Sequence, residues 1–187
     1  GTTTFASGNG LTGDYYHIDH YGSGSVHITG TAGTQTESQI NFQNNFPFSL
    51  NDRFLAAWNG YIVPRTTGTY DFRTYSDDGV RLWIGGISKI NNWTDHGTTA
   101  NTASVNLTAG IPVSVTMHMY EAYGGAVAKL LWRPPGTSSY QIIPTASLFT
   151  TQPAQDAVKF ITDHQTTTAS VSINGGQSDE VISDLNV

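Results

Sequence analysis

Apolar and polar residues alternate over short stretches in the middle of the chain, between Phe54 and Trp132. The clearest stretch is residues 111–119, where isoleucine, valine and methionine occupy every second position. The same two-residue period recurs in residues 54–63, 69–75, 80–84 and 126–132, and turn-forming residues separate these stretches. Short strands with turns about every 8 to 12 residues are typical of all-β sandwiches and barrels. The pattern therefore predicts an all-β fold.

After Pro144 the pattern changes. Residues 150–156 are a polar connector, residues 154–161 show a weak helical period, and residues 170–173 and 180–182 flank an Asn-Gly-Gly turn that is typical of a hairpin. We therefore expect one domain over residues 1–149, and a connector with C-terminal strands over residues 150–187. Those strands either pack on the domain or lead into a neighbouring one.

Composition narrows the possible functions. The chain has 187 residues, no cysteine and a net charge of -6, with only 12% charged residues. Without cysteine there is no thiol catalysis, disulfide or zinc–thiolate site. The acidic balance argues against nucleic acid and anionic lipid as partners, since these need a basic stripe. No apolar run reaches the roughly 18 residues of a membrane helix. The first residues carry no signal peptide, so we expect a piece of a larger protein.

Two adjacent carboxylates, Asp77 and Asp78, lie between two predicted strands. They repel each other unless a cation or hydrogen-bond donors compensate. Calcium takes 6 to 8 oxygen ligands and often combines Asp carboxylates with backbone carbonyls. A second loop, residues 121–125, carries two glycines that would let carbonyls turn towards an ion. A solvated or capping turn is the alternative interpretation of the pair.

Ordered motifs across residues 8–149 resemble the PA14 domain family, a β-sandwich found in toxins, glycosidases and adhesins. They are Gly10-Leu11-Thr12-Gly13-Asp14-Tyr15-Tyr16, Phe54 with Trp58 and Gly60-Tyr61-Ile62, Gly68-Thr69-Tyr70 with Phe72, Ser76-Asp77-Asp78-Gly79-Val80-Arg81-Leu82-Trp83-Ile84, Asn92-Trp93 with His96, Leu107 with Ala109-Gly110, Tyr120-Glu121 with Gly124, Leu130 with Trp132, and Ile143-Pro144. The resemblance implies an antiparallel sandwich with a C-terminal extension.

The resemblance also implies a calcium site. In sugar-binding members a cis peptide joins the two aspartates, which hold one Ca2+ that ligates neighbouring sugar hydroxyls. Carried over, the calcium ligands are Asp77, Asp78, Tyr123, Gly125 and Val127, and the sugar-binding residues are Asp77, Asp78, Tyr123, Gly124 and His17. Tyr123 stands where the family has an amide, so its backbone carbonyl is expected to serve.

The resemblance therefore predicts a calcium-dependent lectin module of an extracellular adhesin that binds terminal saccharides on cell-surface glycans in cell attachment or biofilm formation. The alternative is a calcium-stabilised structural or protein-docking module that binds no sugar. We expect a monomeric module within a larger chain, no nucleic-acid or membrane partner, and no enzyme, since two adjacent aspartates on one ion cannot divide the acid and base roles of a glycosidase.

Three further features are open to other interpretations. Residues 17–21 place two histidines three apart around an aspartate, which is compatible with a transition-metal site, but we expect a polar loop after a strand at Tyr15-Tyr16. Trp93 and His96 could form a stacking platform, although packed and hydrogen-bonded positions are favoured. The other tryptophans lie in strand patterns and are expected in or near the core.

Overall fold

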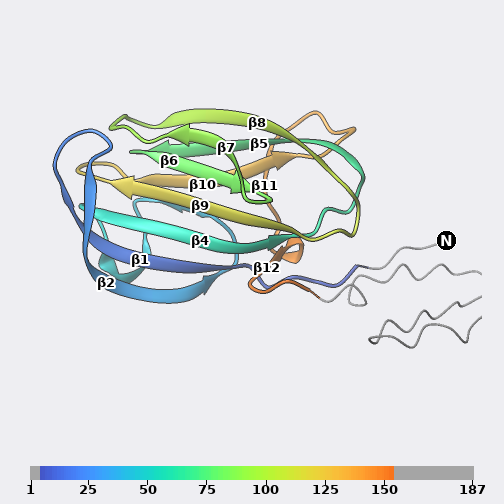
Figure 1. The fold of residues 1–187 in the computed structure, drawn as a ribbon, viewed down its shortest axis with the longest axis horizontal. Helices are drawn as coiled ribbons and strands as arrows, with labels where there is room; N and C mark the ends of the chain where they lie inside the picture. The colour runs from blue at the N-terminus through green and yellow to red at the C-terminus, as the bar shows by residue number, and fades with distance from the viewer. Residues whose placement is uncertain (1–4, 154–187) are drawn as a thin grey trace, which may run out of the picture.

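The computed structural model describes residues 5–153, which form two antiparallel β-sheets packed face to face (Figure 1). The larger sheet has the order β2-β1-β4-β9-β6-β7, with β12 paired to β4, and the smaller sheet has the order β11-β10-β5-β8, with β3 paired to β10. The strands of the larger sheet are β1 (Leu11–His20), β2 (Val26–Glu37), β4 (Phe54–Ile62), β6 (Val80–Ile84), β7 (Ile87–Asn92), β9 (Val113–Glu121) and β12 (Leu148–Phe149). Those of the smaller sheet are β3 (Asn41–Gln43), β5 (Gly68–Asp77), β8 (Thr99–Leu107), β10 (Val127–Arg133) and β11 (Gln141–Ile142). Two short 3-10 helices, η1 (Pro47–Ser49) and η2 (Thr145–Ser147), complete the elements. The predicted antiparallel sandwich is confirmed.

The two-residue period decides which side chains fill the core. Successive side chains of a strand point to opposite faces, so every second residue of β5, β6 and β10 is buried between the sheets. Trp58 and Phe72 are fully buried, and Trp132 is nearly so, as the strand pattern predicts. Trp83 lies on the outer face of β6 and is half-buried.

Two of the chain's crossings between the sheets lie at the same end of the sandwich. Residues 78–79 carry the chain from β5 in the smaller sheet to β6 in the larger one, and residues 122–126 carry it back from β9 to β10. Asp77 is the last residue of β5 and pairs with Val127, the first residue of β10. Glu121 is the last residue of β9 and pairs with Phe54. The two crossings therefore bring three carboxylates to one end.

Two local expectations were wrong. His17 and His20 lie within β1, which continues to His20 and pairs with β2 beyond it, so this stretch is not a loop. The strand predicted from residue 111 begins at Val113, because Gly110 has a left-handed φ and Ile111 is exposed in the turn before the strand. The predicted helical period and terminal hairpin of residues 154–182 fall outside the described residues. Within residues 5–153, no helix has the length and apolar character needed to cross a bilayer.

Candidate metal centre

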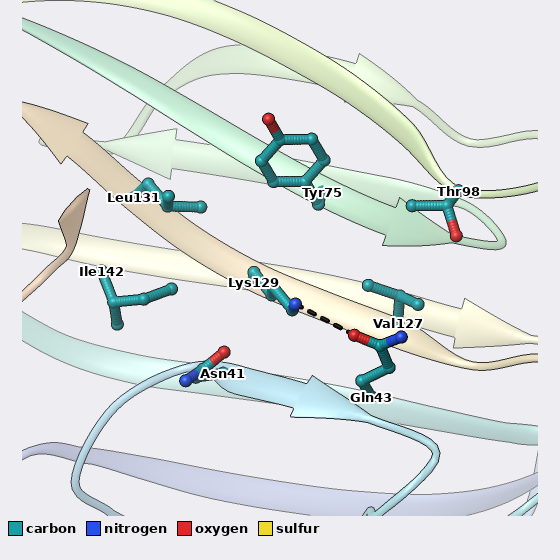
Figure 2. Close-up of a pocket in the computed structure, with 8 residues that line it drawn as sticks. All are labelled: Asn41, Gln43, Tyr75, Thr98, Val127, Lys129, Leu131 and Ile142. Carbon is teal, nitrogen blue, oxygen red and sulfur yellow. Dashed lines mark hydrogen bonds between the residues drawn. The ribbon is translucent and has the colours of Figure 1, made fainter. Parts of the chain in front are cut away.

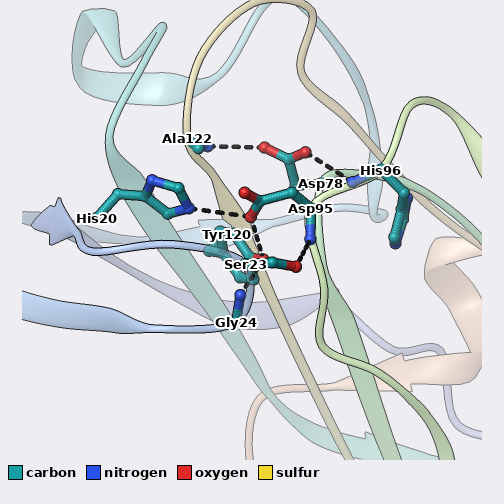
Figure 3. Close-up of polar contacts among 8 residues, drawn as sticks. All are labelled: His20, Ser23, Gly24, Asp78, Asp95, His96, Tyr120 and Ala122. Carbon is teal, nitrogen blue, oxygen red and sulfur yellow. Dashed lines mark hydrogen bonds and ion pairs between the residues drawn. The ribbon is translucent and has the colours of Figure 1, made fainter.

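Asp78 is held by two backbone donors from different loops. Its Oδ1 accepts the N–H of His96 at 3.0 Å, and its Oδ2 accepts the N–H of Ala122 at 2.8 Å (Figure 3). The side chain is only 7% exposed. Each oxygen of an ionised carboxylate can accept more than one interaction, so both keep a lone pair for a cation. The two hydrogen bonds therefore fix the carboxylate without saturating it.

Asp77 precedes Asp78 across a cis peptide bond, as the resemblance implies. Burial and the neighbouring charge of Asp78 raise the pKa of Asp77 above its ordinary value. The hydroxyl of Thr98, 3.4 Å from Asp77 Oδ2, opposes this rise only in part. A bound cation would remove the repulsion between the two carboxylates.

Glu121 brings a third carboxylate to the same place. Ligand oxygens of Asp77, Asp78 and Glu121 all lie within 4.8 Å of one another. Glu121 is fully buried, and neither of its side-chain oxygens has a hydrogen-bond partner within the described part of the chain. Burial and the charges of Asp78 and Asp77 raise the pKa of Glu121 to about 9. A buried, unpartnered carboxylate is costly unless a cation or a proton compensates it.

The three carboxylates fit a hard divalent cation. Hard cations such as calcium prefer carboxylate and carbonyl oxygens, and three converging carboxylates supply more negative charge than a divalent ion carries. The N–H groups that bind Asp78 come from the backbone, so they orient the site without competing as ligands. The donor set is all oxygen, and the described residues place no histidine or cysteine ligand within the cluster.

The loop that holds Asp78 is itself fastened by Asp95. Asp95 accepts hydrogen bonds from the hydroxyl of Tyr120 at 2.6 Å and from Nε2 of His20 at 3.0 Å, and its own N–H donates to Ser23. These hydrogen bonds hold the pKa of Asp95 below its ordinary value even though burial opposes them. Figure 3 shows that the β1–β2 turn, the loop after β7 and β9 meet here. The His96 donor is therefore positioned by a network that begins on β1.

The glycine loop lies against the cluster through its backbone. A Cβ added to Gly125 would lie 4.0 Å from Asp77 Oδ2 and 3.9 Å from Asn44 Oδ1, so this stretch of backbone passes close to the first carboxylate. Gly124 has a φ of 111°, which favours glycine, and its N–H donates to Asp52. The loop is closed by Asn44, whose N–H and Oδ1 bind the carbonyl and N–H of Ala126.

Not every predicted residue reaches the acidic cluster with its side chain. Tyr123 is 64% exposed and lies edge-on to the ring of His20, with 6.2 Å between the ring centroids. Val127 pairs with Asp77 in the sheet, and its side chain carries no ligand atom, so only its backbone carbonyl could bind an ion. His17 is exposed on β1, and the histidine tied into the neighbouring network is His20. The carbonyl ligands at Tyr123, Gly125 and Val127 stay predictions.

Sequence reasoning did not include Glu121 in the metal-binding set. Its only signal was a carboxylate at the junction of a strand with the glycine loop, and the same position suits a solvated turn. The contributions of Asn44 and Asp52 could not be found either, since both lie more than 60 residues from the loop they support. Trp93 packs on Tyr120 with 4.8 Å between the ring centroids, and the guanidinium of Arg81 covers it, as its packed interpretation expects.

Residues 7–146 match the PA14 domain family, and the chain belongs to that family. The anti-sigma-I factor RsgI3 of Acetivibrio thermocellus is 35% identical over 98 residues, which are 52% of this chain and 15% of that protein. The structure of an anti-sigma factor domain-containing protein from Clostridium clariflavum is 26% identical with a TM-score of 0.69, covering 80% of this chain and 50% of that one. This chain therefore spans only part of either relative.

The prediction of an adhesin lectin is wrong. The structure of a PA14 sugar-binding domain from an RTX adhesin has a TM-score of 0.59, covers 77% of this chain and 99% of that one, and is 18% identical, so it shows the fold alone. The more similar proteins are described as anti-sigma factors, which are regulators. The motifs that carry the resemblance are mostly strand and turn positions that any member of the fold needs, which is why they could not separate an adhesin from a regulator. The alternative, a sandwich module without sugar binding, agrees better with these relatives.

Proposed function

We propose that this chain is the sensing module of a regulatory protein of the anti-sigma-factor type. We further propose that Ca2+ bound by Asp77, Asp78 and Glu121 holds the loops at that end of the sandwich in one arrangement. Two relatives, one 35% identical over 98 residues and one 26% identical over 80% of this chain, support the regulatory role. No catalytic role is proposed. The observation that carries the calcium assignment is Glu121, a fully buried carboxylate without a hydrogen-bond partner that faces two others.

The geometry explains what calcium would do in such a module. The three carboxylates come from the ends of β5 and β9 and from the turn into β6, so a single ion would tie the smaller sheet to the larger one. Asp78 also binds the backbone of the loop after β7 and of the loop after β9. An ion at this point would hold both loops in one arrangement, and a regulatory partner would meet a defined surface.

Calcium binding is tested by thermal unfolding with Ca2+ and with EDTA. An ion that binds only the folded state adds about 2.7 kcal/mol at 100 times its Kd, which corresponds to about 5 to 10 °C in a domain of this size. The Asp78→Asn variant is expected to lose this shift. The matched control, Asp14→Asn, removes a carboxylate of β1 that the cluster does not include and is expected to keep it. A wild-type chain that melts at the same temperature in both buffers would contradict the calcium assignment.

The regulatory role is tested in a chimera. The 98-residue segment of RsgI3 that this chain matches is replaced by the corresponding part of this chain, and transcription from a promoter dependent on the cognate sigma factor is measured. We expect the chimera to repress the promoter, and we expect Asp78→Asn in the chimera to change the response to the inducing signal. If wild-type and variant chimeras respond alike at equal protein levels, the metal end has no part in sensing.

A further inference from the structure

A groove on the outer face of the smaller sheet begins at the metal end. It has a volume of about 340 Å³. It is lined by Asn41, Gln43, Tyr75, Thr98, Val127, Lys129, Leu131 and Ile142 (Figure 2). Thr98 lines the groove and also lies within hydrogen-bond distance of Asp77, and Val127 pairs with Asp77 in the sheet. The groove is therefore continuous with the candidate metal centre.

The groove face carries three cations and two carboxylates. Arg73, Lys129 and Arg133 point outward from β5 and β10, and Asp71 and Asp77 point outward from β5 on the same face. Asp71 is bound by Arg133. Arg73 stacks on the ring of Tyr140, with 3.8 Å from the guanidinium carbon to the ring centroid. These contacts leave Lys129 as the cation that lines the groove itself.

Lys129 lies in the middle of the groove without a carboxylate partner. Its Nζ donates a hydrogen bond to the side-chain oxygen of Gln43, 3.1 Å away (Figure 2). No ion pair joins Lys129 to an acidic residue within residues 5–153. A cation beside a neutral amide gains a stronger, charge-assisted hydrogen bond when a carboxylate takes the place of solvent.

The side chains of β10 that line the groove have the same spacing as alternate side chains of an extended peptide. Val127, Lys129 and Leu131 point outward from alternate positions of β10, so their spacing equals that of alternate side chains in any extended strand. From Val127 to Arg133 the strand covers about 20 Å, the length of about six extended residues. Aliphatic side chains and Tyr75 form the apolar part of the lining. This alternation of apolar and cationic positions fits a peptide that alternates apolar and acidic residues.

We propose that the groove along β10 binds an extended acidic peptide segment of a protein partner, with Lys129 pairing with a carboxylate of the peptide and Leu131 and Val127 contacting its apolar residues. The inference names the partner of the sensing module and so rests on the proposed function. Calcium at the cluster would favour the same partner, because it neutralises the carboxylates at the end of the groove.

The test uses fluorescence anisotropy with labelled ten-residue peptides that alternate valine with glutamate, serine or lysine. The glutamate peptide is expected to bind at least tenfold more tightly than the serine peptide, and the lysine peptide is expected not to bind. Lys129→Glu should weaken binding of the glutamate peptide at least tenfold. Lys89→Glu makes the same charge change on β7 of the other sheet, outside the groove, and should leave the affinity within twofold.

The same samples are unfolded with Ca2+ and EDTA, so the two proposals fail separately. A normal calcium shift in a chain that does not prefer the glutamate peptide overturns the groove inference and leaves the metal assignment intact. Peptide binding that depends on Lys129, in a chain without any calcium shift, supports the groove inference and overturns the metal assignment. A labelled acidic oligosaccharide that binds through Lys129 in place of the peptide, or a dimer that Lys129→Glu dissociates, would also overturn the inference.

Discussion

Replacement of Glu121 by glutamine should stabilise the calcium-free protein, although it removes a buried carboxyl group. The pKa of Glu121 is raised from its ordinary 4.5 to about 9 by burial and by the charges of Asp78 and Asp77. At pH 7 the folded chain therefore holds a proton that the unfolded chain has released. Holding that proton costs about 3 kcal/mol of folding free energy. Glutamine is neutral in both states and avoids this cost.

The sign of the pH dependence follows from the same pKa. The contribution of the Glu121 carboxyl to the free energy of unfolding is full below about pH 4.5, where the group is protonated in both the folded and the unfolded state. This contribution is lost as the pH rises towards 9. The stability difference between Glu121→Gln and the wild type should thus be under about 1 kcal/mol at pH 5 and about 3 kcal/mol at pH 7. At pH 7 this corresponds to about 6 to 12 °C in melting temperature.

Calcium should reverse part of this advantage. The wild type gains from the ion because Glu121 ionises against it, whereas the neutral glutamine is a weaker ligand, so the variant's calcium shift should be smaller. The assay is chemical denaturation of both proteins between pH 5 and 9, with EDTA and with Ca2+. A variant that is less stable than the wild type in EDTA at pH 7, or a stability difference that does not grow with pH, would refute the reasoning.

Two further substitutions test the packing and hydrogen bonding of the sandwich. Gly79→Ala would place a Cβ 2.3 Å from the ring of Tyr120, so we expect a loss of about 1–3 kcal/mol in a denaturant titration; an unchanged midpoint would show that the ring moves freely. Tyr15→Phe removes the buried 2.6 Å hydrogen bond to Glu37 and should cost about 1–3 kcal/mol; a stability equal to wild type would show that the bond contributes little.

The strand pattern could be predicted well because its cause is local. An alternating stretch such as residues 80–84 buries every second side chain whichever strand it pairs with. The ends were less predictable, because the end of a strand depends on its partner: β1 continues to His20 since β2 pairs with it there, and nothing near His17 in the sequence indicates this. The PA14 motifs predicted the family, but they are largely the positions that the fold requires. They therefore predicted the sandwich correctly and the adhesin function wrongly.

The sequence by itself determined that strands would form and that Asp77 and Asp78 would lie together, because neighbours in the chain stay neighbours in any fold. Only the tertiary structure decided that Glu121 joins them. The reason is topological: β5 leaves the smaller sheet and β9 leaves the larger one at the same end of the sandwich, so residues 43 positions apart become ligand neighbours. The burial that makes Glu121 a strong candidate ligand exists only once both sheets have closed around it.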